Sequence, residues 1–311
     1  MMEKKERYKQ LNTYLKEKFG ERTLKICIDG GFTCPNRDGT LGYGGCIYCS
    51  EKGSGELIHS ASSISEQVQH YFTTYRAKRA NKFIAYFQNF TNTYDSIENL
   101  KMKYDSALID DRIVGLSIGT RPDCITEEIA KLLQSYTNKY YVCVELGLQT
   151  SNDEIGKVIN RGYTSADFTK AVTILHQYGI DVVAHIMVGL PYETKQDIEN
   201  TVAFVNALPL QGVKIHSTYV VEHTALADMY RKGEYQALDL DDYIETLIDI
   251  LTHLNPNFVI HRVSGDAPKD ILVAPSWNKH KMWILHGFEK RFEARDLWQG
   301  KFYQKSTIQN S

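Results

Sequence analysis

Long apolar runs are missing from this chain of 311 residues. No stretch reaches about eighteen apolar residues, so no segment is expected to span a membrane. Residues 1–20 are charged and have no apolar signal-peptide core behind them, which favours the cytoplasm. In that reducing compartment, clustered cysteines are more often metal ligands than disulfides.

A strong net charge is also absent. The formal charge is −2 at pH 7, and the hydrophobic fraction of 42% and charged fraction of 24% are ordinary for a soluble globular protein. The overall charge therefore gives no argument for nucleic acid as a partner. There is no low-complexity linker and no short-period repeat, and the chain is long enough for one α/β barrel or two ordinary domains.

Short apolar, β-branched runs alternate with segments of helical period. The expected strands lie at residues 24–28, 83–87, 113–118, 141–148, 181–188 and 213–221. The expected helices between them lie at residues 64–78, 97–108, 127–136, 166–178 and 194–208. Six strands that alternate with helices indicate parallel βαβ units and predict an α/β fold, a partial (β/α)6 TIM-type barrel.

Three parts are expected along the chain. Residues 1–22 form an N-terminal helical segment, residues 23–235 form the partial barrel, and residues 236–311 form a C-terminal α/β appendage. The appendage has a helix over residues 240–254, an apolar run NFVIHRV, and a basic, Trp-rich tail.

Three of the six cysteines lie in one glycine-rich loop, CPNRDGTLGYGGCIYC, directly after the first expected strand. Parallel α/β barrels place their active sites at that end of the strands. A disulfide with one free thiol is disfavoured in a reducing compartment, and zinc would normally need four Cys or His ligands. Thiolates from Cys34, Cys46 and Cys49 would suit a four-iron cluster with one iron left open for a chelating cofactor.

The loop resembles the cluster loop of the radical S-adenosylmethionine enzymes, whose hallmark is C-x3-C-x2-C. The first spacing is longer here, as in the subgroup that includes the catalytic subunit of Elongator. The segment VELGLQTSNDEIGKVINRGY (144–163) is similar to the E-x-G-x-Q-S … N-R-G-H signature of the Elongator-like and coproporphyrinogen-oxidase-like group, and AHIMVGLPYET (184–194) is similar to its fifth-strand motif.

Three further segments resemble the bacterial YtqA/YhcC-type (MnmL-like) branch of that group. They are YFQNFTNTY (86–94), GTRPDC (119–124) and HRVSGDAP (261–268). The resemblance thus covers nearly the whole chain. It implies a [4Fe-4S] cluster and S-adenosylmethionine as cofactors, and cleavage of the latter to a 5′-deoxyadenosyl radical that removes hydrogen from an unactivated C–H bond.

The resemblance also implies roles for individual residues. Tyr48 would pack near the adenine, although a core aromatic is the alternative. Gln88 and Asn89 would meet the methionine amino group, in a place where this chain lacks the usual Gly-Gly. Gln149 and Arg161 match motif positions, and Arg161 would pair with the methionine carboxylate unless it forms a surface salt bridge.

Other polar residues of the expected strands have open roles. Glu145 is a candidate catalytic residue at the ribose or the reactive site, or it bonds a neighbouring cation, because an isolated buried carboxylate would be costly. His185 replaces an acid that some relatives carry and is a candidate cofactor contact. Cys27, Cys124 and Cys143 lack ligand-like spacing and are expected to be buried structural cysteines.

The substrate follows from the resemblance, which implies conversion of a carboxymethylaminomethyl group to an aminomethyl group on the tRNA wobble uridine. Residues 279–305 carry seven Lys or Arg against three Asp or Glu, and residues 3–25 carry eight against four. Trp277, Trp283 and Trp298 lie in or beside the tail, and aromatics among cations suit single-stranded RNA. The candidate RNA contacts are Lys279, Lys281, Lys290, Arg291 and Arg295.

Alternatives remain open for the partner. The tail is equally well explained as a solvated basic face with tryptophans in the core. A radical enzyme acting on a small molecule or peptide, or a non-catalytic zinc or iron–sulfur protein, would need no RNA. The radical chemistry itself implies an electron donor of the flavodoxin or ferredoxin type.

Overall fold

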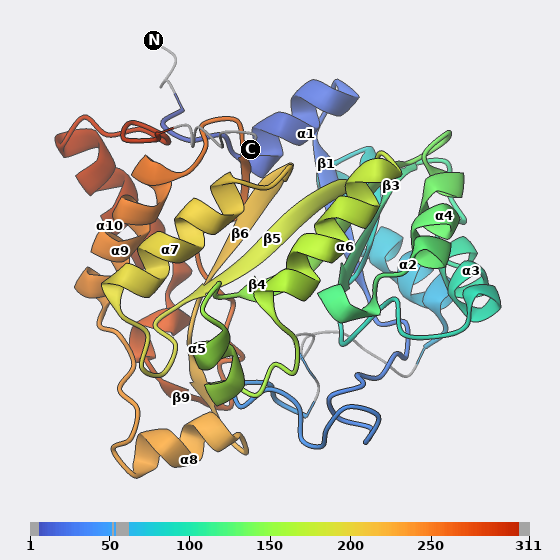
Figure 1. Ribbon diagram of the computed structural model, residues 1–311. Coiled ribbons are helices and arrows are strands. Elements are labelled where there is room, and N and C mark those ends of the chain that lie inside the picture. The colour runs from blue at the N-terminus through green and yellow to red at the C-terminus, as the bar shows by residue number, and fades with distance from the viewer. Residues whose placement is uncertain (1–5, 52, 54–61, 305–311) are drawn as a thin grey trace, which may run out of the picture.

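Seven parallel strands form one curled sheet, the frame of the molecule (Figure 1). The computed structural model describes residues 6–51, 53 and 62–304. In sheet order, the strands are β1 (Thr23–Ile28), β2 (Lys82–Phe87), β3 (Ile113–Thr120), β4 (Tyr141–Gln149), β5 (Asp181–Val188), β6 (Gly212–Ser217) and β8 (Val259–Arg262). The predicted α/β partial barrel is therefore confirmed.

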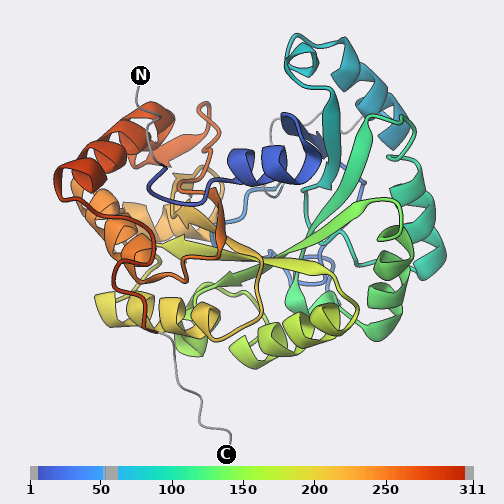
Figure 2. The same ribbon diagram turned by 90° about the horizontal axis from the view of Figure 1, so that it is seen from above.

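Helices surround this sheet, and Figure 2 shows most of them in an outer ring. They are α1 (Leu11–Phe19), α2 (Ile64–Thr73), α3 (Ile97–Asp105), α4 (Glu127–Tyr136), α5 (Asp153–Val158), α6 (Ser165–Gln177), α7 (Lys195–Asn206), α8 (Ala225–Arg231), α9 (Leu240–His253) and α10 (Lys281–Ala294). Short 3₁₀ helices lie at Ala77–Arg79, Pro122–Cys124 and Ser276–Lys279. Buried side chains such as Leu133, Val172 and Leu247 join the helices to the sheet in one core.

Several helices begin where side chains satisfy the free N–H groups of the first turn. Ser63 and Glu66 form a capping box at the start of α2, and Thr164 and Asp167 form another at the start of α6. These caps fix the residue at which each helix begins. They therefore also fix where the loop that precedes the helix ends.

The seventh strand comes from the segment predicted to be an appendage. β8 pairs in parallel with β6, with Val213 opposite Ile260 and Lys214 opposite Arg262. The six-strand prediction is one strand short, because only four residues of the NFVIHRV run reach the sheet and so short a run carries little periodicity. The predicted 213–221 strand also divides, since β6 ends at Ser217 and β7 (Val220–Val221) pairs antiparallel with β9 (Leu272–Ala274).

Helix α1 lies between the two edge strands at the end where the strands begin. Gln10 forms a parallel bridge with Ile260, whose N–H donates to the Lys9 carbonyl. Figure 2, seen from that end, shows α1 across the open side of the sheet. Among the described residues, no helix is long and apolar enough to cross a membrane.

Candidate active site

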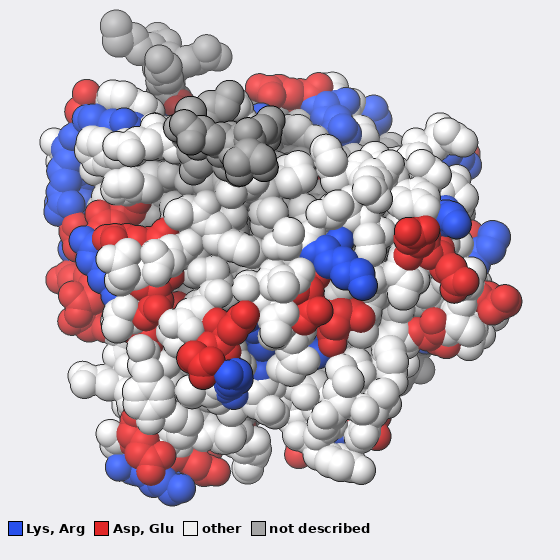
Figure 3. All heavy atoms as spheres, in the orientation of Figure 1, with Lys and Arg blue, Asp and Glu red and all other residues white. Residues whose placement is uncertain are grey.

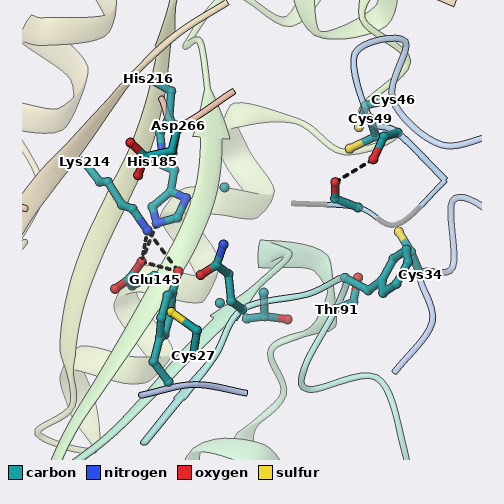
Figure 4. A pocket seen from close by; sticks show the side chains of 18 of the residues that line it. Cys27, Cys34, Cys46, Cys49, Thr91, Glu145, His185, Lys214, His216 and Asp266 are labelled. Carbon is teal, nitrogen blue, oxygen red and sulfur yellow. Dashed lines mark hydrogen bonds and ion pairs between the residues drawn. The ribbon is translucent and has the colours of Figure 1, made fainter. Parts of the chain in front are cut away.

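A cavity of about 600 Å³ lies where the strands end. Its wall takes Cys27 from β1, Tyr86 from β2, Glu145 from β4, His185 from β5 and Lys214 from β6. Figure 4 shows the cysteine loop and the Glu145 group on separate sides of this cavity. The site therefore has two chemically different halves, one rich in sulfur and one rich in charge.

The three cysteines of the glycine-rich loop all line the cavity: Cys34, Cys46 and Cys49. A hydrogen bond with Cys49 lowers the pKa of Cys46 to about 7. Among the described residues, no three Cys, His, Asp or Glu side chains come close enough to hold a single metal ion, as a zinc site requires. Three separate thiolates fit a four-iron cluster, in which each cysteine takes its own iron and one iron stays open.

The cysteine loop is fastened to the segment that follows α5. The Asn36 amide donates to the Asn160 carbonyl at 2.6 Å, and the Asn160 amide donates to the Gly45 carbonyl at 2.8 Å. The Ile47 N–H also donates to the Ile159 carbonyl. Within the loop, Arg37 donates to the Cys49 carbonyl at 3.0 Å. These bonds shape the loop through backbone and amide groups and leave the thiols facing the cavity.

Arg161 is not among the described residues that line the cavity. Its side chain is fully buried and donates to the carbonyls of Leu148, Thr150 and Tyr163 at 2.5–2.8 Å. It also forms an ion pair with Asp153 at 2.5 Å. Because the N–H donors of the guanidinium already bind protein groups, the structure does not support pairing with a methionine carboxylate. Arg161 holds the turn after β4, and its full burial contradicts the surface-salt-bridge alternative.

Gln149 and Tyr48, two of the predicted cofactor contacts, both line the cavity. Gln149 ends β4 with φ of 67°, a left-handed conformation that is strained for a residue other than glycine. A Cβ at Gly147 would lie 2.7 Å from the Gln149 amide nitrogen, so the glycine makes room for that side chain. Tyr48 also packs beside Ile155 and Leu190, so it is at once a cavity residue and part of a small apolar cluster.

The end of β2 is only partly as predicted. Gln88 lines the cavity, whereas Asn89 is buried outside it and donates to Asp29 at 2.9 Å. The cavity residue there is Thr91, whose buried hydroxyl has no partner among the described residues. Arg121, held by Asp123 at 2.8 Å, also reaches the cavity. Sequence reasoning missed Thr91 and Arg121, although both lie within motifs that carry the resemblance.

Glu145 lies at the centre of the charged half of the cavity and binds several of its side chains. Its carboxylate accepts from Lys214 at 2.8 Å, His185 at 2.7 Å and Tyr86 at 2.9 Å, and it forms an ion pair with Lys25. Burial by itself would raise the pKa of Glu145, but the two lysines bring it well below its usual range. A carboxylate with so many donors is a counter-ion rather than a base. Of the two predicted roles, the structure supports bonding to neighbouring cations.

Burial shifts the pKa values of two groups that bind Glu145. Burial lowers the pKa of Lys214 to about 8 and that of His185 to about 4. His185 therefore lines the cavity as a neutral imidazole bound to Glu145. His216, two residues beyond Lys214, lines the same wall and has an Nε2 atom without a partner among the described residues. Alternation in VKIHS, with Lys214 and His216 on one face, is the sequence signal that would have found both.

The other cysteines differ from one another. Cys143 is buried, as predicted, and burial raises its pKa to about 12. Cys124 is half-buried. Cys27 is exposed to the cavity, so its prediction as a buried structural residue is wrong. On β1 it alternates with the neighbouring apolar residues, which places its thiol on the inner face of the sheet.

The seventh strand adds two residues that sequence reasoning did not assign. Arg262 and Asp266 both line the cavity, and Nη2 of Arg262 lies 2.8 Å from Oδ2 of Asp266. Lys281 at the start of α10 reaches the other carboxylate oxygen at 3.2 Å. Both cavity residues lie in HRVSGDAP, one of the segments that carry the branch resemblance.

The five candidate RNA contacts do not form one surface. Lys281 lies at the cavity through Asp266, and Lys279 is exposed in the preceding 3₁₀ helix. Arg291 pairs with Asp241 and Glu245, and Arg295 pairs with Glu245 at 2.6 Å. Figure 3 shows acidic and basic side chains interleaved over α9 and α10. The positive charge of Arg291 and Arg295 is thus balanced locally.

The C-terminal end of α10 also lies away from the cavity mouth. Asp296, just after α10, pairs with Arg7 at 3.0 Å, and the Lys9 carbonyl bonds the start of β8. That is the end where strands begin. Lys290 is exposed on α10. Trp277 is buried and donates to the Leu238 carbonyl, whereas Trp283 and Trp298 are exposed.

Sequence comparisons place the chain among known proteins. The profile of the Radical SAM superfamily matches residues 34–205, and that of the Radical_SAM C-terminal domain matches residues 210–294. The uncharacterized protein YtqA of Bacillus subtilis is 38% identical over 301 residues, which cover 96% of this chain and 94% of YtqA.

More distant matches extend the comparison. The tRNA uridine(34) acetyltransferase of Dehalococcoides mccartyi is 33% identical over 177 residues, or 56% of this chain and 37% of that protein. The solved structure of archaeal Elp3 from Methanocaldococcus infernus, lacking its N-terminus, matches with a TM-score of 0.65 at 18% identity. That match covers 89% of this chain and 64% of the Elp3 chain and supports the shared fold.

Proposed function

The chain belongs to the radical SAM superfamily, and on that premise we propose that it modifies a tRNA wobble uridine, converting a carboxymethylaminomethyl group to an aminomethyl group. Members of the family use a [4Fe-4S] cluster and S-adenosylmethionine. When bound, they supply a 5′-deoxyadenosyl radical that removes a hydrogen atom from a C–H bond. Cys34, Cys46 and Cys49 would hold the cluster, with Tyr48, Gln149 and Gln88 around S-adenosylmethionine.

The proposed reaction balances without an added oxidant. The CH₂ between the amine and the carboxylate loses one hydrogen atom to the deoxyadenosyl group, then one electron and one proton, which leaves an imine. Water hydrolyses the imine to the aminomethyl product and a two-carbon aldehyde acid. The electron that leaves the substrate equals the one used to cleave S-adenosylmethionine, and a flavodoxin- or ferredoxin-type donor would supply the first one.

The observation that carries this proposal is the charge of the cavity. Among the described residues, its wall contains six Lys or Arg side chains but only two carboxylates, Glu145 and Asp266. Such an interior favours an anionic substrate group. A relative named as a tRNA uridine(34) acetyltransferase supports RNA as the carrier of that group. Lys281, which pairs with the cavity residue Asp266, and the exposed Lys279 are the candidates for phosphate contacts nearest to the cavity in sequence.

A small molecule or peptide with the same N-alkylglycine group is the second candidate, because the cavity charge alone does not require RNA. The test uses anaerobically reconstituted protein with tRNA that bears or lacks the carboxymethylaminomethyl group. We expect 5′-deoxyadenosine and aminomethyluridine in equal amounts with the first tRNA, and only slow 5′-deoxyadenosine formation with the second. Equal output from both tRNAs, with no new nucleoside, would overturn the proposal.

A further inference from the structure

The wall formed by β6 and β8 holds charged groups that the cofactor contacts do not use. Lys214 and Arg262 are opposite each other in these strands, and His216 lies two residues beyond Lys214 on the same face. Figure 4 shows His216 and Asp266 on the Lys214 side of the cavity, away from the three cysteines. A substrate placed here would face the cysteine loop across the cavity.

Arg262 and Asp266 differ from the other ion pairs of the wall because both keep free hydrogen-bonding capacity. Glu145 already accepts from several donors, whereas Asp266 accepts one N–H from Lys281 at Oδ1 and forms an ion pair with Arg262 at Oδ2. Each carboxylate oxygen has two acceptor sites, so Asp266 retains two. Among the described residues, Arg262 pairs with Asp266 through Nη2, which leaves its other donors for a ligand.

We propose that Arg262 and Asp266 form a subsite for a zwitterionic N-alkylglycine group, with the carboxylate on Arg262 and the ammonium on Asp266. The assignment of this group to a modified uridine rests on the proposed function above. A guanidinium binds a carboxylate through parallel N–H···O bonds, and a carboxylate accepts from an ammonium. His216, whose Nε2 has no partner among the described residues, supplies a further polar contact on the same wall.

The pairing of opposite charges argues against a phosphate at this place. A phosphate would gain from Arg262 but would face the Asp266 carboxylate, which lies 2.8 Å from the same guanidinium. A group that carries an ammonium and a carboxylate on one carbon matches both charges. The subsite thus binds both the ammonium and the carboxylate of the group. The carbon that loses hydrogen lies between these two.

The test measures binding of nucleosides to the reconstituted full-length protein by calorimetry. The probes are 5-carboxymethylaminomethyluridine, its carboxamide, and the analogue with an ether oxygen in place of the amine. Wild type should bind the acid about tenfold or more tightly than either analogue, as charge-assisted hydrogen bonds predict. Arg262→Gln should remove the preference over the carboxamide, and Asp266→Asn the preference over the ether.

Arg112→Gln is the matched control, because its Nη2 also lies 2.8 Å from an aspartate, Asp110, but outside the cavity. It should keep both preferences. Loss of S-adenosylmethionine binding in Arg262→Gln would instead place Arg262 in the cofactor site and overturn the subsite. If the wild type shows no preference yet modifies the tRNA, the subsite is wrong and the proposed function stands; if it does neither, both fail.

Discussion

Nζ of Lys214 lies 2.8 Å from Oε2 of Glu145 in the interior of the sheet, where the glutamate side chain is fully buried. Lys25 and His185 bind the same carboxylate. One buried negative charge thus keeps two lysines inside the protein. Burial lowers the pKa of Lys214, and the Glu145 carboxylate opposes that shift.

Replacing Glu145 should therefore be costly. We expect Glu145→Gln to lower the free energy of unfolding by about 3–5 kcal/mol, because both lysines lose their counter-ion. Urea denaturation of the variant measures this loss. Glu154→Gln, which breaks an exposed pair with Lys157, is the control and should cost less than about 1 kcal/mol. A Glu145 variant as stable as this control would contradict the counter-ion role.

Stability should also fall in mild acid. His185 has a pKa of about 4 in the folded protein against 6.5 ordinarily, so between these values the unfolded chain binds more protons. Its destabilising effect is absent above about pH 6.5 and grows as the pH falls towards 4, to about 2 kcal/mol at pH 5. Urea midpoints at pH 7 and pH 5 should therefore differ less in His185→Gln than in wild type. The exposed His176→Gln should leave the difference unchanged.

Arg161 is predicted to act on stability rather than on the cofactor. Arg161→Ala removes bonds to three backbone carbonyls and leaves Asp153 without its cationic partner, which should cost about 3–5 kcal/mol. Arg161→Lys should recover little, because an ammonium lacks the planar fork that spans these carbonyls. Thermal denaturation reports the loss. A stable Arg161→Ala protein with weakened S-adenosylmethionine binding would restore the role implied by the resemblance.

The cysteines offer a comparison within one cavity. Reconstituted wild type should hold about four irons per chain, and Cys34→Ala, Cys46→Ala and Cys49→Ala should each lose the cluster. Cys27→Ala should keep it, although the Cys27 thiol is exposed to the same cavity. Iron analysis and the visible absorption spectrum measure this. Iron loss in Cys27→Ala alone would require another set of ligands.

Binding of tRNA should depend on salt through Lys279 and Lys281. Lys279→Gln with Lys281→Gln should reduce the slope of log affinity against log salt by about 0.7–0.9 for each phosphate that the two lysines no longer neutralise. Arg291→Gln with Arg295→Gln should change the slope little, since acidic residues on α9 already balance both charges. Filter binding over a range of salt concentrations distinguishes the pairs. The reverse order would place the RNA at the C-terminal end of α10.

The strands and the cysteine loop could be predicted because their signals are local. Apolar periodicity marks β1 to β6, and the spacing of Cys34, Cys46 and Cys49 lies within one loop. The partners of Arg161 and Arg291 could not be predicted from the sequence. A guanidinium can bind a ligand, a backbone carbonyl or a surface carboxylate, and tertiary contacts decide among these. The exposure of Cys27 escapes prediction because strand alternation does not reveal which face borders a cavity.

The contact between Gln10 and Ile260 joins segments near opposite ends of the chain. During synthesis, β6 leaves the ribosome before β8. Until β8 pairs with it, the outer edge of β6 has unpaired N–H and C=O groups. Pairing across so long a separation is slow, because loop closure must precede the stabilising contacts. The cysteine loop is thus made early, whereas the wall that carries Arg262 is completed last. A nascent chain stalled before residue 259 would present an open sheet edge, a surface prone to aggregation.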